Sequence, residues 1–202
     1  MWSAYPQDGD PDVDVHRRMS APENEIPVAV PLNTLLARTP DVAVALTGLQ
    51  VYSTGVSFDL AFRVRSPLDA AHRGLSDLVF EHGPSAGRFL LGIELADGRR
   101  ASNVFGRDTD DGIVFHAGGG GGGELSVDQS WWLHPLPPEG PVRFVLGCAA
   151  LGIEETSTVI DGGLLRRAAA DVVVRRAPGP EGHDRPPPPA PDLPSDSWFA
   201  GS

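Results

Sequence analysis

Apolar and polar residues alternate along several short stretches of this chain, which is the pattern of β-strands with one buried face. The clearest stretch is 55–65, in which Val56, Phe58 and the following even-numbered residues through Val64 are apolar and would face one way. The short link Ser53-Thr-Gly55 joins it to a second apolar stretch, 41–52, and such a short link permits antiparallel pairing. The pattern therefore predicts a half-buried β-hairpin.

Further strand-like segments and turn signals follow along the chain. We expect strands at 26–36, 89–95, 99–105, 113–115, around the Trp131-Trp132 pair, and at 141–148 and 154–160. Pro27 and Pro31 cannot donate to a strand ladder, so the first of these segments should lie at a sheet edge. Helical spacing and capping residues predict a short helix within 66–87 and a second one from Asp161. The fold class that these elements predict is mostly β: an antiparallel β-sandwich of about eight or nine strands with one or two peripheral helices.

Composition divides the chain into three parts. Residues 1–25 are acidic and poor in apolar side chains, so we expect a disordered N-terminal tail. Residues 26–176 hold all the predicted elements and should form a single β-sandwich domain. Residues 177–202 are rich in proline and should form a disordered C-terminal tail.

Charge and hydropathy limit the classes of partner. The chain has a net charge of -11, its sixteen basic residues are all arginine, and no basic stripe stands out, so we expect no nucleic-acid partner. No apolar run reaches the roughly 18 residues of a membrane helix, and the start lacks a secretory pattern, so we expect a cytoplasmic protein without membrane contact. The single cysteine, Cys148, lies on the apolar side of its strand and should be a buried small hydrophobe.

A run of six glycines is the most unusual feature of the sequence. The run comprises Gly118, Gly119, Gly120, Gly121, Gly122 and Gly123. Glycine has no preferred backbone conformation, so we expect a flexible loop that leads into the aromatic strand. The run lacks the lysine of a phosphate-binding loop, since the chain contains no lysine, and we expect no nucleotide cofactor.

The tryptophan pair that follows the glycines is the most prominent candidate for binding. In a strand, Trp131 and Trp132 point to opposite faces, so one would be a core residue and the other would share the second face with His134. That second ring either packs under the glycine run or a helix, or forms an exposed platform for a protein or a sugar. The predicted partner-binding residues are accordingly Gly118–Gly123, Trp131, Trp132 and His134.

No pattern in the sequence predicts a catalytic or metal-binding residue. The six histidines form no closely spaced pair, and no nucleophile elbow positions a serine. Asp108, Asp110 and Asp111 precede Gly112 but lack the alternating ligands of a calcium loop, so a solvated turn is the favoured interpretation. We therefore expect no metal and no cofactor.

Several motifs in the same order resemble those of a set of uncharacterised actinobacterial proteins. These motifs include the glycine run, the segment Trp131-Trp-Leu-His-Pro-Leu-Pro-Pro and the segment Gly152-Ile-Glu-Glu-Thr. The resemblance covers most of residues 26–176. It implies a bacterial source of that kind and no particular activity or site.

Two hypotheses about function follow from these observations. The leading hypothesis is a non-enzymatic, cytoplasmic β-sandwich module that binds another protein. The alternative is a hydrolase or small-ligand-binding protein with a site near the glycine run, His116 and His134. A cluster of those histidines with a carboxylate in a pocket would favour the alternative. The sequence does not predict the oligomeric state.

Overall fold

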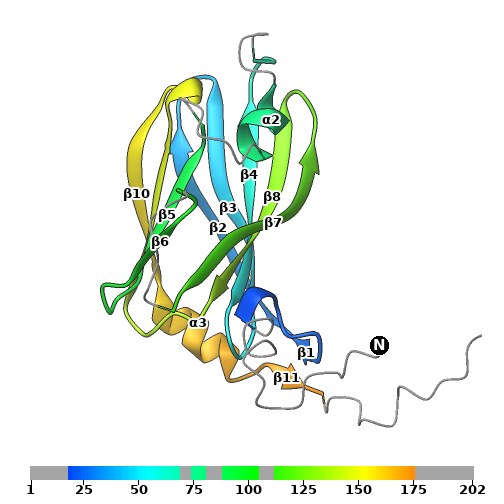
Figure 1. The fold of residues 1–202 in the computed structure, drawn as a ribbon, viewed down its shortest axis with the longest axis vertical. Helices are drawn as coiled ribbons and strands as arrows, with labels where there is room; N and C mark the ends of the chain where they lie inside the picture. The colour runs from blue at the N-terminus through cyan, green and yellow to red at the C-terminus, as the bar shows by residue number, and fades with distance from the viewer. Residues whose placement is uncertain (1–17, 69–73, 81–87, 105–111, 176–202) are drawn as a thin grey trace, which may run out of the picture.

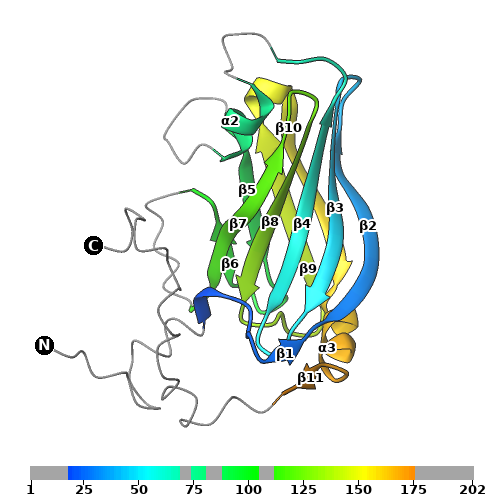
Figure 2. The same ribbon diagram turned by 90° about the vertical axis from the view of Figure 1, so that its right-hand side faces the viewer.

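Two antiparallel β-sheets make up most of the molecule. The computed structural model describes residues 18–68, 74–80, 88–104 and 112–175. The larger sheet has the strand order β2-β3-β4-β8-β7, with β2 at Val28–Arg38, β3 at Val42–Val51, β4 at Val56–Val64, β8 at Ser126–His134 and β7 at Val114–Gly122. The smaller sheet has the order β10-β9-β5-β6, with β10 at Ile153–Asp161, β9 at Pro141–Cys148, β5 at Leu90–Glu94 and β6 at Arg100–Ser102. Figure 1 shows the two sheets side by side, and Figure 2 looks onto the five-stranded sheet.

The sheets pack face to face because each strand has one apolar side. In β4, Phe58, Leu60 and Phe62 are almost completely buried, as their alternation predicted. Phe144 of β9 meets Phe58 edge to face at 5.4 Å across the two sheets. Thr156 of β10 donates a hydrogen bond of 2.9 Å to the Leu36 carbonyl of β2, which joins the sheets along one edge. The prediction of an antiparallel β-sandwich is confirmed.

Individual strand predictions also agree with the structure. The hairpin predicted over 41–65 is the β3–β4 pair, and the Asp97-Gly98 turn, with Gly98 at a φ of 87°, joins β5 to β6. The proline-containing strand β2 lies at the edge of its sheet, and its ladder is irregular between Val30 and Asn33, around Pro31. Proline removes a ladder donor, which explains the irregularity.

Helices lie at the two ends of the sandwich (Figure 1). Helix α2 (Leu75–Phe80) buries Leu75 and Val79 in the core at one end. Residues 66–68, at which the sequence predicted a helix start, are not helical. Helix α3 (Gly162–Ala169) begins at Asp161, whose carboxylate accepts a 2.8 Å hydrogen bond from the Gly163 amide as the predicted cap. None of the helices in the described parts of the chain is long and apolar enough to cross a membrane.

Described residues with regular structure precede the predicted domain boundary. Residues 18–25 were expected to belong to a disordered tail, yet the structure describes them, and β1 (Glu25–Ile26) pairs with β11 (Val173–Val174) in a small third sheet. Hydrogen bonds to Ser53 and Arg175 fasten this segment, and its composition did not predict these distant partners. Residues 1–17 and 176–202 lie outside the described residues.

We expect Phe58→Ala to lower the free energy of unfolding by roughly 3–5 kcal/mol, because the ring is buried between the sheets and packs against three other rings. Val159→Ala, at a position that is 53% exposed, is the control and should change stability by less than about 0.5 kcal/mol. Denaturant unfolding measures both. Equal effects of the two substitutions would contradict the assigned core.

Candidate functional site

The glycine run is a β-strand and not a loop. Strand β7 extends through Gly122 and pairs with β8, with Gly120 opposite Gln129 and Gly122 opposite Val127. The prediction of a flexible loop over Gly118–Gly123 is therefore wrong for most of the run. No strand of the described residues pairs with the other side of β7, so the glycines form an edge of the five-stranded sheet.

Close packing explains why three of these residues are glycine. A Cβ atom on Gly120 would lie 2.9 Å from the Gln129 Cα and 3.0 Å from the Phe80 ring, and one on Gly122 would lie 2.6 Å from the Val127 Cα. A Cβ atom on Gly118 would lie 2.8 Å from the Ser130 hydroxyl. Neither Gly119 nor Gly121 has a described atom within 4 Å of its Cβ position. The even-numbered glycines let β7 approach β8, whereas the others face open space.

Trp131 is a core residue. It is 2% exposed and stacks on Phe115 with ring centroids 5.0 Å apart and on Phe58 at 6.4 Å. Its indole nitrogen donates a 3.1 Å hydrogen bond to the side chain of Gln129, which is also buried. Trp131 therefore contributes to stability and not to a binding surface.

Trp132 lies on the outer face of the same sheet but is only 4% exposed. Its indole nitrogen donates a 2.7 Å hydrogen bond to the Arg18 carbonyl, so residues before β1 cover it. Tyr52 packs against the ring edge to face, with centroids 5.7 Å apart. An exposed platform at Trp132 therefore does not exist in this structure, and the alternative of a packed second ring is confirmed, although the N-terminal segment rather than the glycine run covers it.

The two histidines of this region do not form a catalytic cluster. His116 Nε2 lies 2.8 Å from the Met19 carbonyl, and the buried Nδ1 atom of His134 has no hydrogen-bond partner. Burial lowers the pKa of His134, a backbone hydrogen bond at Thr54 opposes this effect, and the charge of Arg18 adds to it. No three His, Cys, Asp or Glu side chains of the described residues are grouped so that they could hold a metal ion. The acidic turn at 108–111 lies outside those residues.

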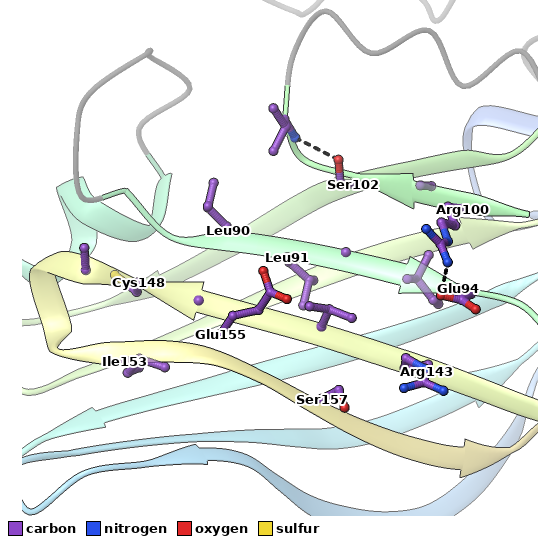
Figure 3. Close-up of a pocket in the computed structure, with 17 residues that line it drawn as sticks. Leu90, Leu91, Glu94, Arg100, Ser102, Arg143, Cys148, Ile153, Glu155 and Ser157 are labelled. Atoms are coloured by element: carbon purple, nitrogen blue, oxygen red, sulfur yellow. Dashed lines mark hydrogen bonds and ion pairs between the residues drawn. The ribbon is translucent and has the colours of Figure 1, made fainter.

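A groove lies on the outer face of the four-stranded sheet, on the opposite side of the sandwich from Trp132. Its volume is about 920 Å³, and strands β5, β6, β9 and β10 supply the lining residues (Figure 3). Leu90 and Val104, which are 42% and 37% exposed, contribute apolar surface. Asn103 donates a 2.9 Å hydrogen bond to the Phe89 carbonyl and accepts one of 2.8 Å from the Leu91 amide, which ties the chain after β6 to β5.

Two outward-facing glycines make the middle of this sheet hollow. Gly92 of β5 is opposite Val145 of β9, and Gly147 of β9 is opposite Leu90. Neither glycine has a positive φ, and a Cβ atom would find its nearest described neighbour at 3.6 Å for Gly92 and 3.8 Å for Gly147, which is ordinary van der Waals contact. Neither backbone conformation nor packing therefore requires glycine at these two positions.

Charged side chains mark the two ends of the groove. At one end Arg100 and Glu94 form an ion pair of 3.0 Å, with Arg143 on the neighbouring strand, while Glu155 lies toward the other end (Figure 3). The side chain of Arg143 makes no ion pair with a described residue. The groove thus has an excess of positive charge at one end and a carboxylate toward the other.

Cys148 adjoins the groove without offering a reactive thiol to it. The residue is 2% exposed, as the strand pattern predicted, and burial raises its pKa although the Leu151 and Ala150 backbone groups act in the opposite direction. A buried thiol with a raised pKa is a poor nucleophile. The Cys148 thiol is therefore not a candidate nucleophile for this groove.

Sequence reasoning missed the groove although part of the signal was present. In β5 the outward positions are Leu90, Gly92 and Glu94, and in β9 they include Val145 and Gly147. Apolar residues and glycines at outward positions could have been noticed from the alternation alone. That β5 and β9 are neighbours, and that the two glycines therefore lie together, required the sheet order.

Comparisons of the chain with protein-family models, with curated proteins and with solved structures find no match.

The two kinds of glycine in β7 should respond differently to substitution. We expect Gly120→Ala to cost roughly 1–3 kcal/mol of stability, because the added Cβ meets backbone atoms of β8 that cannot move freely. Gly121→Ala is the matched control and should be neutral or slightly stabilising, since its Cβ position is open. Thermal unfolding distinguishes them. A similar loss for both would indicate that the run does not pair with β8 in the assigned register.

The pKa of His134 implies a pH-dependent contribution to stability. Because burial lowers this pKa in the folded state, the unfolded chain binds more protons at His134 as the pH falls through about 6.5. Stability from this group is present above that value and decreases below it. We expect the unfolding free energy of wild type to fall more steeply than that of His134→Gln between about pH 8 and pH 5. Parallel pH profiles would refute this assignment.

Proposed function

We propose that this protein is a non-enzymatic, cytoplasmic module that binds an extended segment of a partner protein in the groove of the four-stranded sheet. One observation carries the proposal: Gly92 and Gly147 leave a hollow on the outer face of the sheet, although neither position requires glycine for its backbone or for packing. Glycine weakens a strand, and the stability of the fold does not explain its presence at both positions. A ligand side chain that enters the hollow supplies that reason.

The chemistry of the lining favours a polypeptide over a sugar or a nucleic acid. The described residues that line the groove include no aromatic side chain, so no ring is offered for stacking on a sugar or a base. Leu90, Val104 and Val145 instead provide aliphatic contacts around the two glycines. An aliphatic side chain of the partner would fit this part of the groove.

The charges define the orientation of the bound segment. Arg143 and the Arg100–Glu94 pair attract an acidic group at one end, and Glu155 attracts a basic group toward the other. The partner segment is therefore extended, with an aliphatic centre between an acidic and a basic residue. Such a segment matches the spacing of side chains along a sheet surface better than a compact helix would.

Filling the hollow should abolish binding without harming the fold. We expect Gly92→Val to retain or slightly raise stability, because valine favours strands and its Cβ position is free of clashes. Peptides selected from a random displayed library on the wild-type protein should bind Gly92→Val at least about tenfold more weakly, the factor that corresponds to loss of one buried aliphatic contact. Direct titration measures both affinities.

Gly121→Val is the control for this experiment, because it places the same side chain at an open outward position on the opposite sheet. It should leave the affinity of the selected peptides unchanged. Selected peptides that bind Gly92→Val as well as wild type, or an equal loss with Gly121→Val, would contradict binding in the groove.

A further inference from the structure

A second surface of the protein is already occupied by a segment of its own chain. Residues 18–26, which we call the cover segment, run from the lower ends of β7 and β8 to β1 (Figure 2). The cover segment contacts the outer face of the five-stranded sheet, which is the side of the sandwich opposite the groove. Trp132 and His116, which are directly opposite each other on β8 and β7, both hydrogen bond to it.

The sheet binds the backbone of the cover segment. The indole nitrogen of Trp132 donates to the Arg18 carbonyl at 2.7 Å, and Nε2 of His116 lies 2.8 Å from the carbonyl of the next residue, Met19. The Met19 side chain is 46% exposed. Arg18 and Met19 are the last residues of a helical turn, and carbonyl groups at the C-terminal end of a helix have no partner within it. Two side-chain donors on neighbouring strands thus hold two successive carbonyl oxygens of this helical turn.

Residues outside the cover segment also hold the Trp132 ring in place. A Cβ atom on Gly55 would lie 2.7 Å from two atoms of the ring, so the absence of a side chain at Gly55 lets the indole lie flat against the β3–β4 turn. Tyr52 packs against the ring from the same turn. Residues of the sheet and the turn therefore build the site, and the cover segment occupies it.

Besides the hydrogen bonds to Trp132 and His116, a few polar contacts hold the cover segment, and most of them are exposed. The Glu25 carboxylate accepts hydrogen bonds from the amide of Ser53, at 2.8 Å, and from its hydroxyl. The β1–β11 ladder has two residue pairs, and the Asn24 side chain donates a 3.0 Å hydrogen bond to the Arg175 carbonyl. These contacts near β1 are exposed, and exposed hydrogen bonds open at low free-energy cost.

We propose that Trp132, His116 and Tyr52 form a peptide-binding site, that the cover segment is its intramolecular ligand, and that a segment of a partner protein that ends in a helical turn binds there by displacing it. Displacement exposes an indole with a free donor, and aromatic rings with a hydrogen-bonding group are favoured anchors at protein interfaces. Because the cover segment is tethered, its effective concentration at the site is on the order of millimolar, so a competitor binds weakly until the fastening is loosened. This site lies on the opposite sheet from the groove and does not depend on the function proposed above.

The test follows the exchange of the indole protons with solvent in the full-length chain by nuclear magnetic resonance. Glu25→Ala removes the acceptor of both Ser53 hydrogen bonds. We expect the Trp132 indole proton to exchange at least about tenfold faster in this variant, while the Trp131 indole proton, bonded to Gln129 in the core, is unchanged. Glu23→Ala is the matched control, since it removes the same charge from the same segment at an exposed residue, and it should leave both rates unchanged.

A synthetic peptide of residues 18–27 then serves as the competitor. We expect this peptide to restore protection of the Trp132 indole proton in the Glu25→Ala variant. The peptide should not bind the double variant Glu25→Ala/Trp132→Phe, because its ring lacks the hydrogen-bond donor. Two results would show that the cover segment opens only with the whole fold and would overturn the proposal. One is an unchanged exchange rate at Trp132 in Glu25→Ala, and the other is an equal acceleration at Trp131 and Trp132. Failure of the peptide to restore protection would also overturn it.

Discussion

The ring cluster between the two sheets is the interaction on which the rest of the structure depends. Phe58 of the five-stranded sheet contacts Trp131 of the same sheet and Phe144 of the opposite one, with ring centroids 5.4–6.4 Å apart. Aromatic side chains bury more area per residue than any other type, so this cluster fixes the separation of the sheets. Both candidate surfaces lie on the outer faces of the same two sheets, and their shapes depend on strands that the cluster holds in place.

Apart from turns with a positive φ, such as the one at Gly98, glycine has three separate roles among the described residues. In β7 the glycines at 120 and 122 allow a close approach to β8, and Gly55 allows the Trp132 ring to lie against a turn. Gly92 and Gly147 have no such neighbours, and they leave a hollow on an outer face. The space around a Cβ position, together with the φ angle, separates glycines that the fold requires from glycines such as Gly92 and Gly147 that it does not.

The two outer faces differ in what covers them. The groove face has aliphatic and charged residues and carries no described segment, whereas the Trp132 face carries residues 18–26 of the chain itself. We propose shape and charge as the basis of partner binding at the groove, and competition with a tethered segment as its basis at the Trp132 face. The two proposed surfaces lie on opposite sides of one sandwich.

The sequence alone determined the fold class, the β3–β4 hairpin, the edge position of β2 and the cap of α3, because alternation, proline and capping residues act over a few neighbouring positions. It did not determine that the glycine run is a strand, since six residues without side chains have no period, and the pairing partner β8 supplies the order. It also left the burial of Trp132 open, because the covering residues come from more than a hundred positions earlier in the chain. The groove could not be predicted from local patterns, because it depends on the pairing of β5 with β9, which are separated in sequence by some forty residues. Residues close together in sequence thus determined most of the elements, and contacts between distant segments decided which outward residues form the two candidate surfaces.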